Sequence, residues 1–133
     1  MPISYTYDRE CNILYENGSG EVTFEDFVNY RMELLSGDLQ PNLRCLIDYT
    51  SAQVNFSFNE MVSLMPSTRQ VSQAIGSIKA AICASDDLGF GMACMYSALI
   101  GDENIEVMVF RNLKDARVWL GIEGDEESNL PVS

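Results

Sequence analysis

The sequence predicts one α/β domain, in which helices cover a mixed, mostly parallel sheet of about five strands. Three observations support this prediction. The chain has 133 residues, the size of one ordinary domain. Hydrophobic residues make up 47% and charged residues 21%, a composition typical of a globular protein. Short apolar runs alternate with helical patterns after an opening hairpin, which gives the order β-β-α-β-α-β-α-β-α with about four helices.

An antiparallel hairpin is predicted at the start of the chain. Residues 3–7, ISYTY, alternate apolar and polar side chains, and residues 13–20, ILYENGSG, form the returning strand. A helix begins next, with Thr23 as its N-cap. Asp26 stands three residues later, so the two residues form an approximate capping box. The segment SGDLQPN ends this helix because glycine and proline interrupt it.

The rest of the chain alternates strands and helices. Three apolar runs are predicted as buried strands, at residues 43–49, 77–85 and 105–110. Helices are predicted at residues 57–76, 86–101 and 112–121. Pro66 should end or kink the first of these helices because it lacks an amide donor. In the second helix, Leu88, Met92, Met95 and Leu99 are expected on one buried side. The domain should span residues 1–122, followed by a disordered acidic tail, 123–133.

The charge balance excludes two classes of partner. The chain has 20 acidic and 8 basic residues, a formal net charge of −12. Because the basic residues are few and scattered, neither a nucleic acid nor an anionic membrane surface is expected to bind. No apolar run approaches the ~18 residues of a membrane span, and the N-terminus has no secretory pattern. We therefore expect a cytoplasmic protein; the sequence leaves a homodimer open.

The inventory of reactive side chains predicts neither a metal site nor an enzyme. The chain has no histidine, and its cysteines at 11, 45, 83 and 94 have no CxxC spacing. Zinc, a disulfide framework and any other cofactor are therefore not expected. G-x-S-x-G and P-loop motifs are absent, and histidine is the commonest general base. No enzymatic activity is predicted.

The last strand and helix carry the best marker of a known family. The segment VMVFRNLKDARVWLG has matching residues at Val107, Val109, Phe110, Ala116, Trp119 and Leu120. The strings AAICASDDLGFGMACMYSAL and LIDYT are further markers. Over residues 3–121 the chain resembles the STAS-like proteins of the SpoIIAA-like family, relatives of bacterial anti-anti-sigma factors. The resemblance implies a SpoIIAA-like fold, also similar to that of CRAL-TRIO domains, and a bacterial regulatory module.

The resemblance also implies a candidate phosphorylation site. In anti-anti-sigma factors a serine near the start of a helix accepts a phosphate from a kinase that is also the binding partner. The matching segment here is VNFSFNE, in which Asn55 stands near the motif's acid and Ser57 is the remaining hydroxyl. Ser57 and Glu60 also have the S-x-x-E spacing of a capping box, which explains the serine without phosphorylation. We expect a cap and retain a phosphoswitch at Ser57 as an alternative.

The leading hypothesis is a non-enzymatic STAS-like module that binds a protein partner. Its predicted surface combines the loop after Asp48, the helix that starts at Ser57 and the loop at residues 85–88. The candidate residues are Asp48, Thr50, Ser51, Asn55, Ser57, Phe58, Met61, Met65, Asp86, Asp87 and Met92. The alternative function is a carrier of an apolar small molecule or lipid, because methionine and aromatic side chains can line an adaptable pocket.

Overall fold

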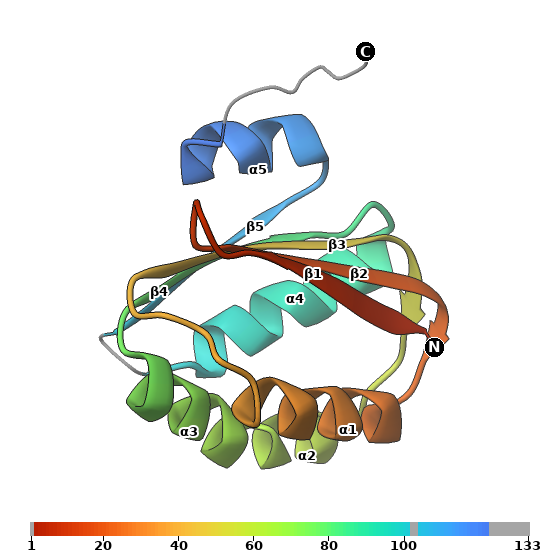
Figure 1. The fold of residues 1–133 in the computed structure, drawn as a ribbon. Coiled ribbons are helices and arrows are strands. Elements are labelled where there is room, and N and C mark those ends of the chain that lie inside the picture. The colour runs from red at the N-terminus through yellow and green to blue at the C-terminus, as the bar shows by residue number, and fades with distance from the viewer. Residues whose placement is uncertain (1, 102–103, 123–133) are drawn as a thin grey trace.

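A five-stranded sheet with helices on both faces forms the core of the computed structural model, which describes residues 2–101 and 104–122 (Figure 1). Its strands are β1 (Ile3–Asp8), β2 (Ile13–Val22), β3 (Leu43–Val54), β4 (Ile78–Cys83) and β5 (Ile105–Phe110). They lie side by side in chain order. β1 pairs antiparallel with β2, and the other three pairings are parallel. The predicted mixed, mostly parallel sheet is confirmed; the predicted tail, 123–133, lies outside the described residues.

Four helical segments cover one face of the sheet, and the last helix covers the other (Figure 1). The helices are α1 (Phe24–Leu35), α2 (Phe58–Ser63), α3 (Met65–Ile75), α4 (Asp87–Leu99) and α5 (Leu113–Leu120). On the α5 face, Ala116 and Leu120 pack against Leu46 and Cys83, and the partly buried Trp119 joins them. In the part of the chain that the structure describes, no helix is long and apolar enough to cross a membrane.

Local capping signals place the helix starts where the sequence predicted them. Thr23 with Asp26, and Ser57 with Glu60, each form both hydrogen bonds of a capping box. Each box satisfies two backbone amides that the helix start would otherwise leave unpaired. The break expected near Pro66 is confirmed, because α2 ends one turn before it and α3 begins again beside it.

β3 extends beyond the point where the sequence predicted a loop. Asp48, the expected strand end, is followed by six more strand residues, so Thr50 and Ser51 lie in β3 and not in a loop. The pairing strand β2 is long enough to continue the ladder, and a register shift between the two strands absorbs one extra residue. Asp48 stabilises this irregularity, because its Oδ1 accepts from the amide (3.0 Å) and hydroxyl (2.6 Å) of Thr50.

The buried side of α4 also differs from the prediction. Leu88 is 62% exposed and Met95 is 38% exposed, although both were expected to face the core. Met92 is buried, and Tyr96 packs beside it. The face of α4 that packs on the core is therefore centred on Met92 and Tyr96, and not on Leu88 and Met95. This orientation brings the small Gly89 towards the sheet, and a small residue permits close contact there.

Candidate functional site

A cavity of about 150 Å³ lies between the sheet and the layer formed by α1 to α4. Most of its lining is apolar and comes from strands and helices alike, including Leu14, Phe27, Phe56, Met61, Val71 and Met92. Small side chains explain why the space is not filled. Ala80 and Ala84 on the sheet side and Ala93 on α4 line it where larger residues would close the gap.

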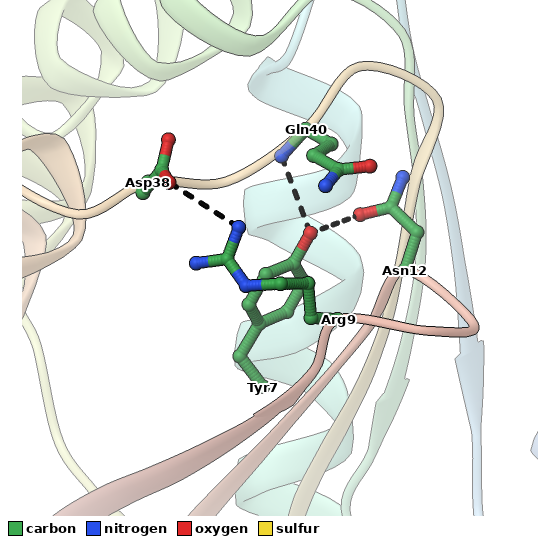
Figure 2. Close-up of polar contacts among 5 residues, drawn as sticks. All are labelled: Tyr7, Arg9, Asn12, Asp38 and Gln40. Atoms are coloured by element: carbon green, nitrogen blue, oxygen red, sulfur yellow. Dashed lines mark hydrogen bonds and ion pairs between the residues drawn. The ribbon is translucent and has the colours of Figure 1, made fainter.

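The segment that connects α1 to β3 contributes Leu39 to the cavity lining. This segment is fastened to the β1–β2 hairpin by contacts among five residues, Tyr7, Arg9, Asn12, Asp38 and Gln40 (Figure 2). The Tyr7 hydroxyl donates to Asn12 Oδ1 (2.5 Å) and accepts from the Gln40 amide (3.3 Å). Arg9 pairs with Asp38 at 3.2 Å on the exposed side. These bonds position Leu39 in the cavity lining.

Glu16 is a carboxyl group buried in this apolar setting. It lies on β2, two residues from Leu14, and therefore points to the same face of the sheet. Only 5% of Glu16 is exposed, and burial raises the pKa of its carboxyl group. The Tyr49 hydroxyl donates to Glu16 Oε2 at 2.5 Å. Gly18 makes room for this tyrosine, because a Cβ there would lie 3.1 Å from the Tyr49 ring.

The hydroxyl of Tyr30 lies in the same interior. Tyr30 is 5% exposed, and its Oη forms no hydrogen bond with any described residue. Burial raises the pKa of Tyr30, and the nearby Glu16 raises it further, so the phenol stays protonated. The interior around Glu16 therefore holds two neutral phenols: the Tyr49 hydroxyl donates to the carboxyl group, and the Tyr30 hydroxyl lies close to it without hydrogen-bond geometry.

Arg31 brings a positive charge to the cavity from α1. Its Nη1 donates to Thr68 Oγ1 (2.8 Å) and Ser67 Oγ (3.2 Å), and its Nη2 donates to the hydroxyl of Tyr96. The guanidinium carbon lies 5.2 Å from the centre of the Phe27 ring. Burial lowers the pKa of Arg31, but its neighbours, Tyr96 first among them, outweigh this effect and raise it. Arg31 is therefore charged at any physiological pH.

Three methionines among the candidate partner or ligand residues are buried. Met61, Met65 and Met92 are 3%, 6% and 8% exposed, and they pack together with Phe56 and Leu64. Their helical spacing places them on the inward faces of α2, α3 and α4, so they do not form an exposed surface for a protein partner. Met61 and Met92 also line the cavity, as the alternative hypothesis of an apolar pocket expected.

The predicted polar residues at the start of α2 lie outside the cavity lining. Ser57 Oγ accepts from the Glu60 amide at 3.1 Å, and the Ser57 amide donates to Glu60 Oε1 at 2.9 Å. Asn55 is exposed in the short connection before this cap, and Phe58, directly after it, is 58% exposed. Ser57 is thus an N-cap, as its spacing predicted.

The second predicted segment, at residues 85–88, lies beside β3. The Ser85 hydroxyl donates to the Thr50 carbonyl oxygen at 2.9 Å. Asp86 is the N-cap of α4, with Oδ1 2.7 Å from the Gly89 amide, and Asp87 pairs with Arg111 at 2.8 Å. The loop at residues 85–88 therefore contacts the part of β3 that follows Asp48. The carboxylates of Asp86 and Asp87 are used in a helix cap and an ion pair.

Asp48 points away from the apolar cavity. It lines a second hollow of about 200 Å³ between the hairpin and α5, with Tyr15 and Arg117. Within residues 2–101 and 104–122, no group of three or more His, Cys, Asp or Glu side chains is placed to hold a metal ion. The chemistry of the interior thus comes from one carboxyl group, one guanidinium and several hydroxyls.

Sequence reasoning missed both Glu16 and Arg31. A signal for Glu16 was present, because a charged residue stands in strand register with Leu14 at an inward position. A signal for Arg31 was weaker. It follows Phe27 by four residues and therefore shares the buried side of α1.

Comparisons with known proteins support the fold. No family profile and no curated protein matches the chain. Among solved structures, it is similar to an uncharacterized protein of the DUF3478 family from Shewanella loihica PV-4, described as having a SpoIIAA-like fold. The two are 18% identical, the match covers 89% of this chain and 91% of that one, and the TM-score is 0.56. The chain has a SpoIIAA-like fold, as its sequence predicted.

Proposed function

We propose that this SpoIIAA-like fold serves as a non-enzymatic binding module for a small, mainly apolar molecule held between the sheet and the helix layer. The supporting observation is the cavity of about 150 Å³ with its largely apolar lining. A largely apolar cavity of about this size in a protein core can bind a molecule such as benzene. The fold alone does not indicate a ligand, so the proposal rests on the cavity.

The cavity volume sets the scale of affinity. At about 24 cal/mol for each Å³ of unfilled space, a volume of 150 Å³ corresponds to about 3–4 kcal/mol of packing energy. A ligand that recovers most of this energy by filling the space binds with a dissociation constant of about 2–5 mM. Apolar contact alone therefore supports weak but measurable binding.

A pair of substitutions on α4 tests the proposal. Ala93 lines the cavity, whereas Ala98 is exposed on the same helix, so Ala→Leu at either position makes the same chemical change. Binding of 1-hexanol is measured by shifts of backbone amide NMR signals. Ala93→Leu should weaken binding by at least about tenfold because the leucine occupies the space, and Ala98→Leu should leave it within about twofold. Equal binding by both variants would place the ligand elsewhere.

A second candidate function is recognition of a protein partner through α2. Phe58 and Val62 are 58% and 41% exposed and lie one helical turn apart, so they form an exposed apolar strip. Capture of a partner from source-cell lysate should be lost in a Phe58→Ser, Val62→Ser double variant. It should persist in Met32→Ser, which removes a 64% exposed apolar side chain from α1. If the wild type, the double variant and Met32→Ser all capture the same proteins, the strip formed by Phe58 and Val62 is not the binding surface.

A further inference from the structure

The charge of Arg31 lacks an anionic partner inside the protein. No carboxylate oxygen of the described residues lies within 4 Å of its guanidinium nitrogens; its hydrogen-bond acceptors are the hydroxyls of Ser67, Thr68 and Tyr96. Arg31 is half-buried, and withdrawing part of a charged side chain from water is costly unless an opposite charge or further hydrogen bonds compensate it. The site therefore favours a ligand that supplies a negative charge.

The guanidinium also has donors to spare. An arginine carries five N–H donors. Nη1 uses two of them, on Ser67 and Thr68, and Nη2 uses one, on Tyr96. Among the described residues, Nε–H and the second Nη2–H have no acceptor. A carboxylate is the small anion whose two oxygens suit neighbouring guanidinium donors best.

Glu16 does not provide the missing charge. It lies beyond ion-pair distance from Arg31, and its one hydrogen bond comes from Tyr49. Its burial favours the neutral carboxyl group over the carboxylate. In its neutral form, which burial favours, Glu16 leaves Arg31 as the net charge of the cavity and does not repel an incoming anion.

We infer that the cavity takes a small carboxylic acid, whose apolar part fills the space beside Phe27 and Met92 and whose carboxylate pairs with Arg31. This inference rests on the proposed function, because it names the ligand class of the same cavity. A volume of about 150 Å³ suits an apolar part about the size of a benzene ring. The guanidinium carbon lies 5.2 Å from the centre of the Phe27 ring and 5.8 Å from that of Tyr96, and these cation–π contacts help to hold the guanidinium in place.

Three probes of equal chain length separate charge from shape: hexanoate, 1-hexanol and hexylammonium. Their affinities for the full chain are measured at neutral pH by NMR titration. Hexanoate should bind about ten- to a hundredfold more tightly than 1-hexanol, the effect expected of buried, charge-assisted hydrogen bonds. Hexylammonium should bind most weakly because its charge opposes that of Arg31.

Substitution of Arg31 assigns the preference to this residue. In Arg31→Met the advantage of hexanoate over 1-hexanol should fall below about threefold, while 1-hexanol still binds and shows that the cavity is intact. Arg31→Lys keeps the charge but loses the planar pair of donors, so an intermediate preference is expected. Arg69→Met removes the same charge from an exposed position on α3 and should retain the full preference.

The outcomes separate the inference from the function on which it rests. If 1-hexanol binds in the cavity as tightly as hexanoate, the carboxylic-acid inference is wrong and the apolar binding function stands. If Arg31→Met retains the hexanoate preference, the anion is recognised elsewhere and the inference is also overturned. If no probe binds the wild-type chain, both the function and the inference fail.

Discussion

Replacing the buried Glu16 carboxyl group with an amide removes its charge and nearly keeps its shape. In Glu16→Gln the side-chain oxygen can still accept the Tyr49 hydrogen bond, so the main difference is the free energy of burying a carboxylate. Burial raises the pKa of Glu16 in the folded protein above its value in the unfolded chain. The folded state therefore binds the proton more tightly than the unfolded state.

The sign of the pH dependence follows from this difference. The contribution of Glu16 to stability is fully present below its unfolded-state pKa and is lost as the pH rises through its folded-state pKa. Above that range the folded protein has a buried carboxylate with one hydrogen bond and no ion pair within 4 Å among the described residues. Incomplete pairing of a buried polar group costs about 1–3 kcal/mol.

We therefore expect Glu16→Gln to raise the free energy of unfolding at pH 8 by about 1–3 kcal/mol and to change it by less than about 0.5 kcal/mol at pH 4. For a chain of this length the gain at pH 8 corresponds to about 3–5 °C in Tm for each kcal/mol. Urea denaturation at both pH values measures the change. Glu21→Gln, on the exposed side of the same strand, is the control for net charge and should change stability by less than about 0.5 kcal/mol.

One result would refute this reasoning. If Glu16→Gln destabilises the protein at pH 8 more than at pH 4, the carboxylate is ionised and stabilising. Glu16 would then act as the counter-charge of Arg31, against the argument that the cavity lacks an anion.

Three further predictions concern local structure. Ser57→Ala should lower the free energy of unfolding by about 1 kcal/mol through loss of the cap, and Ser57→Asp should restore it; equal stability of both variants in thermal denaturation would contradict this. In Gly91→Ala the new Cβ meets no atom within 4 Å, so this variant should stabilise α4 by about 0.5–1 kcal/mol. In Gly89→Ala the new Cβ lies 2.7 Å from Asp86 Oδ1, so this variant should destabilise α4. Urea denaturation that ranks the two variants in the opposite order would refute this prediction. Cys94 is exposed and should react rapidly with a disulfide reagent. Cys83 is buried, which raises its pKa to about 12, so its thiol should stay unreactive until the protein unfolds. Similar reaction rates for the two thiols, followed by mass spectrometry, would contradict this prediction.

Interactions that span one helical turn were readable from the sequence. The capping pairs Thr23–Asp26 and Ser57–Glu60 are three residues apart, and both form as predicted. The alternation of apolar strands with helices likewise predicted the mixed sheet, because these periods depend only on local backbone geometry. The burial of Cys45 and Cys83 followed from their apolar surroundings in the sequence.

The site depended on features that no local pattern contains. Glu16 meets Tyr49 across 33 residues, and Arg31 meets Tyr96 across 65. The first contact requires the register of β2 with β3, including its shift, and the second requires the inward face of α4 to carry Tyr96. The cavity itself arises where small residues of distant elements, such as Ala80 and Ala93, face one another. Sequence determines the faces of each element, whereas packing decides which faces meet and what space remains between them.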